Sequence, residues 1–409
     1  MKFGGIGISL IWLCGVCAPA VAQTLPSEPV TFVDGHLVVG GDVSAAFGSD
    51  DPGFFNYTDY EYSALRMLRI DLSATLNAGD HVAVLGEVRT ENFDRFQPYA
   101  LYLRIRPWAK KDVAVEIGRI PPTFGAFARR GYGSDNPLIG FPLGYQYMTS
   151  LRPDSLPANA DELLRKRGLG WLDRFSVGNQ TPDRGVPLVS AFRWDTGLQA
   201  HAGNDLVNGT VAVTTGTVAN PLFHDDNAGR QVAARVELRP IAGLILGTSL
   251  AHGPFVASDA IRAAIAKGAH DGSFTQTAWG ADVEYSAGYL LARFESIASR
   301  WRLPTIDAIA VDLPIDAVST SFEGRYKLMP GLYVAARLDR LVFSDVVGTT
   351  QTAPWDAPVG RVEIGAGYSI QRNLLLKVSF QHNSRDRQPR DIPIESLERL
   401  GAAQLVYWF

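Results

Sequence analysis

The chain has 409 residues, 20% of them charged, and a formal net charge of −4. This mildly acidic balance argues against a nucleic-acid-binding protein, which would present a basic surface. Forty glycines, 20 phenylalanines and 14 tyrosines, with no low-complexity linker, favour one large unit built from many short, half-apolar strands.

The first 22 residues have the pattern of a cleaved export signal. A basic start is followed by an apolar run, and small residues at Ala20 and Ala22 fit a signal-peptidase site. The mature chain is therefore expected to begin at Gln23 and to form a single domain over residues 23–409. Both cysteines of the chain lie inside the removed segment, so neither disulfides nor cysteine-ligated metals are expected in the mature protein.

Sixteen later segments alternate apolar and polar residues with the period of two that is typical of β-strands. They are His36–Phe47, Ser63–Leu76, His81–Glu91, Tyr99–Arg106, Asp112–Arg119, Ser190–Ala202, Thr210–Val218, Arg230–Arg239, Leu244–Ala251, Thr275–Tyr285, Tyr289–Ser299, Val318–Leu328, Leu332–Phe343, Val359–Ile370, Leu374–Asn383 and Arg399–Phe409. No later apolar stretch approaches the roughly 20 residues that a membrane-spanning helix needs. Short turns alternate with longer loops along the whole chain. This pattern predicts an all-β fold, a transmembrane antiparallel β-barrel with short periplasmic turns and long extracellular loops.

Each predicted strand has one apolar and one polar face, as Val334 and Leu338 opposite Arg337 and Asp339 illustrate. Charges on the lipid side cost about 2–4 kcal/mol for Arg or Lys at the bilayer midplane, so the polar faces should point inward. Opposite charges recur two positions apart on these faces, which either orient solutes or simply keep a wide polar lumen neutral. The expected pore-lining residues are Arg69, Asp71, Glu87, Arg89, Arg104, Arg106, Arg235, Glu237, Arg293, Glu295, Glu323, Arg325, Arg337, Asp339, Arg361 and Glu363.

The longest connection, Ile120 to Pro187, follows the fifth strand. It carries too many aromatic residues for a solvated loop, and its two consecutive prolines turn the chain off the strand line. We expect it to fold into the lumen as a constriction, with a short helix over Ala160–Arg167 capped by Asn159. The alternative is a loop that lies outside, over the rim or against a neighbouring subunit. The expected constriction residues are Arg129, Arg130, Asp135, Arg152 and Asp154.

The chain ends on an alternating strand whose last three residues are aromatic, whereas the last residues of most domains are frayed and solvated. This ending resembles the C-terminal assembly signal of Gram-negative outer-membrane proteins. Tyr407 and Phe409 are the residues that carry the resemblance, which implies recognition by the barrel-assembly machinery.

The export signal, the sixteen strands, the long loop and the terminal Phe together resemble the Gram-negative outer-membrane porins. The resemblance implies an outer-membrane channel for passive diffusion of small hydrophilic solutes and ions. It also implies contacts with lipid and lipopolysaccharide, and a homotrimer as one option. The residues Gly118 to Gly125 are similar to the start of the inward loop in phosphate-selective porin O/P-like proteins, so an anion- or phosphate-selective porin is the alternative. The sequence shows no ladder of uncompensated arginines that would support phosphate selectivity.

Two other classes of function remain open. His382-Asn383-Ser384 resembles the His-x-Ser pair of outer-membrane lipid A deacylases, which would make the chain a lipid-modifying enzyme. An amphipathic helix over Ser258–Lys267 in an outer loop would suit an adhesin. No nucleophile elbow, P-loop or zinc-protease motif is present in the sequence, so we expect neither catalysis nor a cofactor or metal.

Overall fold

The structure is a computed structural model of the chain. It describes residues 26–58, 62–227, 229–269, 274–304, 306, 314–386 and 397–409. The expected export signal and the expected start of the mature chain at Gln23 lie outside the described residues.

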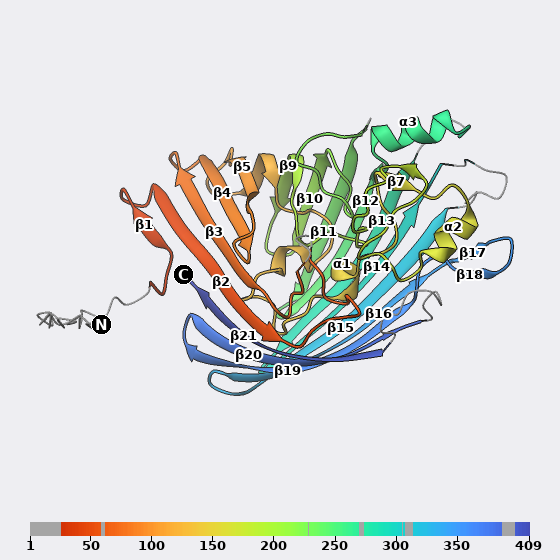
Figure 1. Cartoon of the computed structure of the whole chain (residues 1–409). Coiled ribbons are helices and arrows are strands. Elements are labelled where there is room, and N and C mark those ends of the chain that lie inside the picture. The colour runs from red at the N-terminus through yellow and green to blue at the C-terminus, as the bar shows by residue number, and fades with distance from the viewer. Residues whose placement is uncertain are drawn as a thin grey trace, which may run out of the picture.

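Sixteen antiparallel strands of the described chain form a closed barrel (Figure 1). They are β2 (Leu37–Gly48), β3 (Leu68–Asn77), β4 (Val82–Glu91), β5 (Phe96–Ile105), β6 (Asp112–Ile120), β9 (Asp195–Gly203), β10 (Val207–Thr214), β11 (Gln231–Ile241), β12 (Leu244–Pro254), β13 (Thr275–Ala287), β14 (Leu290–Trp301), β15 (Ile315–Met329), β16 (Leu332–Phe343), β19 (Val359–Gln371), β20 (Leu374–Arg385) and β21 (Leu397–Trp408). Each pairs with the next, and β21 closes on β2, where Trp408 lies opposite Asp42. The predicted transmembrane antiparallel barrel is confirmed.

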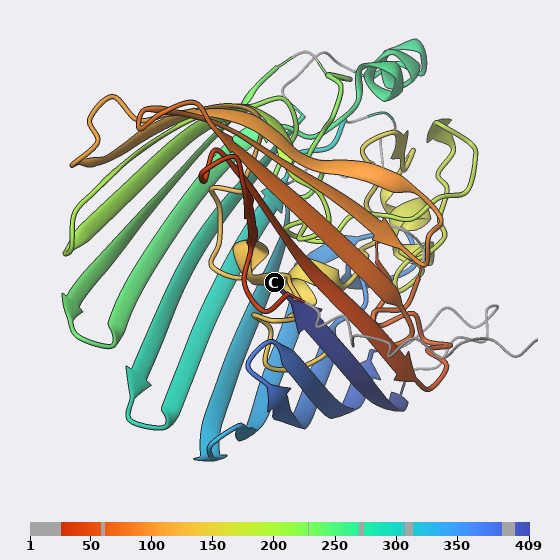
Figure 2. The same cartoon turned by 90° about the vertical axis from the view of Figure 1, so that its left-hand side faces the viewer.

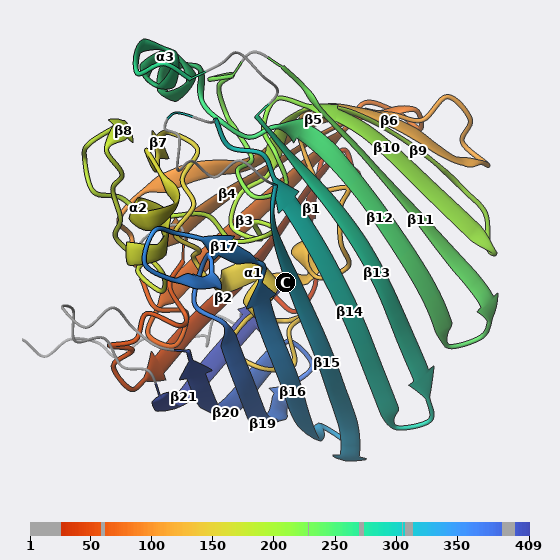
Figure 3. The same cartoon turned by 90° about the vertical axis from the view of Figure 1, so that its right-hand side faces the viewer.

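The strand faces separate as the alternation predicts. In β16, Val334 and Leu338 are 40% and 53% exposed on the outer face, while Ala335 and Arg337 are buried on the inner face. An apolar outer surface suits lipid, and polar groups are thereby kept inside the barrel. Figures 2 and 3 show from opposite sides that the tight turns gather at one end, whereas helix α3 (Ser258–Ala266) lies at the other.

The predicted starts differ most at the second strand, expected from Ser63 but beginning at Leu68 in β3, and at the sixth, expected from Ser190 but beginning at Asp195 in β9. For the sixth strand the cause can be named. The reason is packing, because Ala191 and Phe192 are buried in an apolar cluster with the long loop and do not extend the pairing with β6. Outside the barrel wall, β1 (Val30–Phe32) pairs with the start of β2, and β17 (Asp345–Val347) pairs with β18 (Thr352–Pro354) in an outer loop. None of the helices in the described ranges is long and apolar enough to cross a membrane.

The largest apolar core lies inside the barrel, between its wall and the connection from β6 to β9. This connection contains η1 (Ala128–Arg130), α1 (Leu143–Gln146), β7 (Ser155–Leu156), α2 (Ala160–Arg165) and β8 (Val177–Gly178). Its buried aromatic and aliphatic side chains pack against small wall residues, which are Ala233, Ala251, Ala278 and Ala317. The small alanines on four strands leave room for the loop, so the predicted inward-folding loop is confirmed. The predicted cap is present as well, since Asn159 Oδ1 accepts from the amide of Glu162 at 2.9 Å.

Candidate functional site

The connection from β6 to β9 runs inside the barrel, along the wall formed by β2, β20, β19 and β16, as the stretch Gly133–Phe141, which we call the crossing segment. The barrel wall holds this segment chiefly through its backbone. The buried Lys377 of β20 donates hydrogen bonds from Nζ to three of its carbonyl oxygens. They belong to Gly133, Asn136 and Leu138, at 2.8, 2.9 and 3.1 Å. Because an ammonium group carries three donors, Lys377 is fully engaged by the loop.

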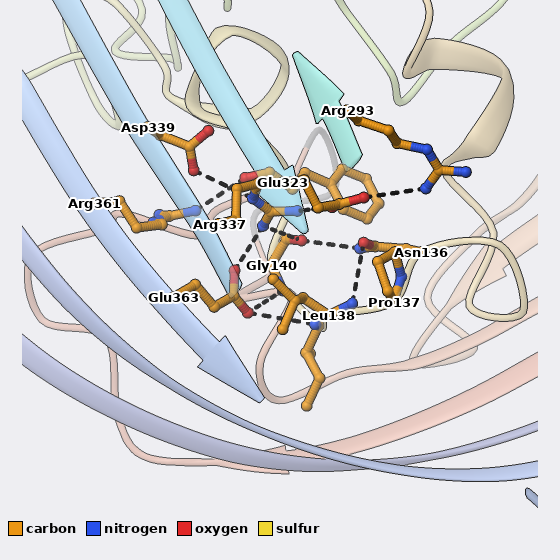
Figure 4. Close-up of polar contacts among 12 residues, drawn as sticks. Asn136, Pro137, Leu138, Gly140, Arg293, Glu323, Arg337, Asp339, Arg361 and Glu363 are labelled. Carbon is orange, nitrogen blue, oxygen red and sulfur yellow. Dashed lines mark hydrogen bonds and ion pairs between the residues drawn. The ribbon is translucent and has the colours of Figure 1, made fainter. Parts of the chain in front are cut away.

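Carboxylate and guanidinium groups continue this set of contacts (Figure 4). The Glu363 carboxylate accepts from the amides of Ile139 and Gly140, at 3.3 and 3.0 Å. The Arg337 guanidinium donates to the carbonyl of Gly140 at 2.6 Å. A Cβ atom on Gly140 would lie 2.8 Å from Glu363 Oε2, so a larger residue here would displace the carboxylate that holds the backbone.

Charged wall residues also hold both ends of the crossing segment. Asp42 of β2 accepts from the amides of Gly133 and Ser134, at 3.2 and 3.0 Å. At the other end, Arg361 of β19 donates to the carbonyl of Phe141 at 3.0 Å. Hydrogen bonds to charged groups contribute about 1.5–3 kcal/mol each, so this set is strong enough to fix the path of the loop. Lys377 and Asp42 were not among the predicted site residues, although each lies on the inward face of its strand.

A row of alternating charges runs across five neighbouring strands of the inner wall. In the order β13, β14, β15, β16 and β19, its members are Glu284, Arg293, Glu323, Arg337 and Glu363, and each lies opposite the next in the strand register. The successive ion pairs measure 2.8, 3.0, 3.3 and 2.6 Å. The predicted pairing of charges along one strand is therefore largely replaced by pairing across strands. Arg130 of the loop extends the row by an ion pair with Glu284 at 2.8 Å.

The opposite wall contacts the loop through tyrosines and a second charged cluster. Tyr132 of the loop donates to a carboxylate oxygen of Glu87 at 2.8 Å. The Arg89 guanidinium forms an ion pair with Asp71 and lies 3.5 Å from the centre of the Tyr99 ring. The loop is thus attached on both sides of the lumen.

Because of these contacts, less of the charged inner wall meets water than the sequence predicted. Eleven of the sixteen expected pore-lining residues are at most 9% exposed, because the loop covers them. They are Arg69, Asp71, Glu87, Arg89, Arg235, Glu295, Glu323, Arg337, Asp339, Arg361 and Glu363. Five others remain accessible to solvent, namely Arg104, Arg106, Glu237, Arg293 and Arg325. For these eleven the structure shows contacts with the loop and with one another where contact with water was expected, and their role in lining a pore stays a prediction.

The expected constriction residues do not come together. Arg152 and Asp154 pair with each other at 2.9 Å in the outer part of the loop, because the chain runs back toward α3 after α1. Arg129 is exposed at the loop's start, where its Nε donates to the carbonyl of Pro122 at 2.8 Å. Asp135 is exposed on the turn side of the crossing segment. Of the five expected constriction residues, the structure places Arg129, Arg130 and Asp135 at cavities inside the barrel, and their role in a constriction stays a prediction.

A cavity of about 170 Å³ lies between the loop's start and the wall formed by β11 to β15. Its charged lining includes Arg129, Arg130, Glu237 and Glu284. Within the part of the chain that the structure describes, Arg129 has no carboxylate within 4 Å, and the same holds for Arg104, Arg106 and Arg325. Among the described residues, the accessible unpaired charge inside the barrel is therefore mainly basic.

The last strand completes the barrel through its backbone. The amide of Phe409 donates to the carbonyl of Gly41, and the amide of Gly41 donates to the carbonyl of Phe409, both at 3.0 Å. The Tyr407 hydroxyl donates to the carbonyl of Pro26. The assembly role of Tyr407 and Phe409 stays a prediction. Both residues form hydrogen bonds with the N-terminal part of the described chain, where the last strand closes the barrel.

The resemblance to a lipid A deacylase rested on His382 and Ser384, and the structure shows no hydrogen bond between these two described residues. His382 and Ser384 share the outer face of β20, and Ser384 donates to the carbonyl of Gly360 at 3.4 Å rather than to the histidine. In the described ranges, no group of three or more His, Cys, Asp or Glu side chains is placed to hold a metal ion.

No protein-family model and no curated protein sequence matches the chain. Solved structures do match in fold. The anion-selective porin from Comamonas acidovorans aligns at 10% identity with a TM-score of 0.55, over 91% of this chain and 99% of that one. OmpF of Salmonella typhi in complex with daunomycin aligns at 11% identity with a TM-score of 0.55, over 91% of this chain and 97% of that one. The outer-membrane channel DcaP of Acinetobacter baumannii aligns at 10% identity with a TM-score of 0.53, over 93% of this chain and 100% of that one. The chain therefore shares the sixteen-stranded barrel fold with these proteins.

Proposed function

We propose that the chain is an outer-membrane porin through which small hydrophilic solutes and ions diffuse passively. The observation that carries the proposal is the crossing segment, a backbone fastened inside a closed barrel by buried charges of its wall. Such a loop narrows a polar interior at a fixed level. A small barrel with a sealed apolar centre would have no use for it.

Among porin types, the accessible charges favour an anion-preferring channel. Arg104, Arg106, Arg129 and Arg325 have no carboxylate partner among the described residues, whereas Glu237 is paired with Arg235 at 2.9 Å. Low-dielectric walls focus the field of these arginines in the lumen. Phosphate specificity is not part of the proposal, because the arginines are not stacked in one ladder.

The same proposal places the mature chain in the outer membrane of a Gram-negative bacterium. Its apolar outer face would contact lipid and lipopolysaccharide, and its closing strand would be read by the barrel-assembly machinery. A homotrimer is the proposed assembly, since OmpT of Vibrio cholerae, similar in fold at 10% identity and a TM-score of 0.52, has been solved as a trimer. We propose no catalytic activity.

A planar-bilayer recording tests the proposal. Refolded mature chain should give discrete conductance steps, and in a KCl gradient the reversal potential should lie toward the chloride potential. Replacing Arg104, Arg106 and Arg129 together by Gln should move it toward the potassium potential. Arg340→Gln, on the outer face of β16, is the matched control. Folded protein that gives no steps would refute the channel, and an unmoved reversal potential would refute the anion preference alone.

A further inference from the structure

A second cavity, of about 580 Å³, lies on the turn side of the crossing segment. It is bounded by the loop and by the ends of β15, β16, β20 and β21 that face the short turns. Its lining includes Asp135, Arg325, Lys327, Tyr333, Leu375 and Trp408. This volume falls in the range of about 300–1,000 Å³ that is usual for small-molecule sites.

The cavity contains two cations that the protein does not neutralise. Arg325 and Lys327 lie two residues apart on the inner face of β15, and among the described residues neither has a carboxylate within 4 Å. The Arg325 guanidinium lies 5.7 Å from the centre of the Tyr333 ring, and its buried Nε has no hydrogen-bond partner. Among the described residues of the lining, Asp135 is the only acidic one, so this lining has an excess of positive charge.

The wall beside these cations is apolar, unlike the charged wall above it. Tyr333, Leu375 and Val406 form a buried cluster with Leu138 of the crossing segment, and Trp408 packs against it. A Cβ atom on residue 367, which is Gly, would lie 2.2 Å from the Tyr333 ring, so this glycine makes room for the ring against the wall. Aromatic and aliphatic surface next to unpaired cations is a combination that a purely hydrophilic passage does not require.

We propose that this cavity binds small organic monocarboxylates with an apolar, preferably aromatic, body. The carboxylate would accept hydrogen bonds from Arg325 and Lys327, since guanidinium and ammonium groups are strong donors to carboxylates. The apolar body would pack against Tyr333, Leu375 and Trp408. Asp135 disfavours a second negative charge at the other end of the ligand. The proposal goes beyond diffusion through a porin, because a folded barrel can bind such a solute whether or not it conducts.

Benzoate is the probe for a calorimetric titration of the refolded barrel in detergent. Acetate lacks the apolar body, benzyl alcohol lacks the charge, and benzylamine reverses it. The proposal expects measurable benzoate binding, with at least about tenfold weaker binding of the other three, because losing one charged or apolar contact is worth about a factor of ten. No binding of benzoate, or equal binding of acetate and benzoate, would overturn it.

Substitutions in the lining test whether benzoate binds in this cavity. Arg325→Gln/Lys327→Gln should weaken benzoate binding at least about tenfold, while Asp135→Asn should strengthen it several-fold by removing the repulsion. Lys111→Gln, which removes an exposed cation outside the cavity, is the control. Heat-modifiable migration on a gel shows that each variant is folded. Benzoate binding unchanged in the double variant would overturn the proposal, and absence of KCl conductance would instead bear only on the proposed channel.

Discussion

One buried ammonium group determines the path of a loop in this molecule. Lys377 is 1% exposed and binds three carbonyl oxygens of the crossing segment. Its positive charge on the inner face of β20, where Arg385 is the other charged residue, could be seen in the sequence. What could not be seen is that its partners are backbone carbonyls, because they depend on a loop path that side-chain alternation does not encode.

Replacing this ammonium should loosen the crossing segment. Lys377→Met keeps the length of the side chain but leaves three carbonyls without their donor, which should cost about 3 kcal/mol of unfolding free energy. Amide hydrogen exchange over Gly133–Phe141 should accelerate, whereas strands far from the loop should not change. Lys327→Met, on an exposed site of the inner wall, is the control. Protection equal to wild type in Lys377→Met would show that the lysine is not an anchor.

A second residue gives the outer part of the loop a pH dependence. Asp173 is 1% exposed, and burial raises its pKa to about 6 despite Lys166 Nζ at 2.6 Å. A raised pKa means that folding favours the protonated form. The stabilisation from Asp173 is therefore complete below its ordinary value of 3.8 and is lost as the pH rises through about 6.

The size of this effect is set by the shift, which corresponds to about 3 kcal/mol at most. Thermal unfolding at pH 4.5 and pH 7.5 should show wild type losing more stability on going to the higher pH than Asp173→Asn does. The difference between the two proteins removes the contribution of other carboxylates. Identical pH profiles would contradict the assignment.

At the scale of elements, the inner wall of β13 to β19 is joined by a row of charges in register. The sequence predicted the inward position of all members of the row except Glu284, but paired them along the strand. Cross-strand pairing depends on strand register, which the spacing within one strand cannot give. Arg337 is central to the row, since it contacts Glu323, Asp339, Glu363 and the carbonyl of Gly140.

Removing Arg337 should therefore be costly. Arg337→Gln leaves buried carboxylates without their partner, a change that typically costs about 3–5 kcal/mol. Denaturant unfolding in detergent should show this loss. Arg340→Gln, three residues along the same strand but on the exposed outer face, should change the stability by less than about 0.5 kcal/mol. Equal effects of the two substitutions would mean that the row does not stabilise the barrel.

At the scale of the whole molecule, the barrel was predictable because strand alternation and the length of connections are local properties of the sequence. The interior was less predictable. Eleven residues that were expected to meet water are buried instead against the loop or against one another, because the loop's apolar core lies deep in the barrel. Alternation tells which side of the wall a residue faces, but not whether that side is empty.

Barrel closure should depend on the terminal aromatic residue. The Phe409 ring packs over Gly41, where a Cβ atom would lie 2.8 Å from the ring. Phe409→Ala should reduce the amount of heat-modifiable, folded barrel in the outer membrane several-fold, with unfolded chain left in the periplasm. Phe380→Ala, on the exposed outer face of β20, should assemble normally. Normal assembly of Phe409→Ala would remove the signal role.

The central claim is that the loop narrows a conducting barrel, and single-channel conductance tests it most directly. Wild type and a variant lacking residues 129–157, which removes the crossing segment together with α1, β7 and most of η1, should both fold and insert into a planar bilayer. Wild type should give small, uniform steps, and the deletion variant should give distinctly larger ones because the crossing segment no longer occupies the lumen. Equal conductance in the two proteins, or no conductance in either folded barrel, would contradict the claim.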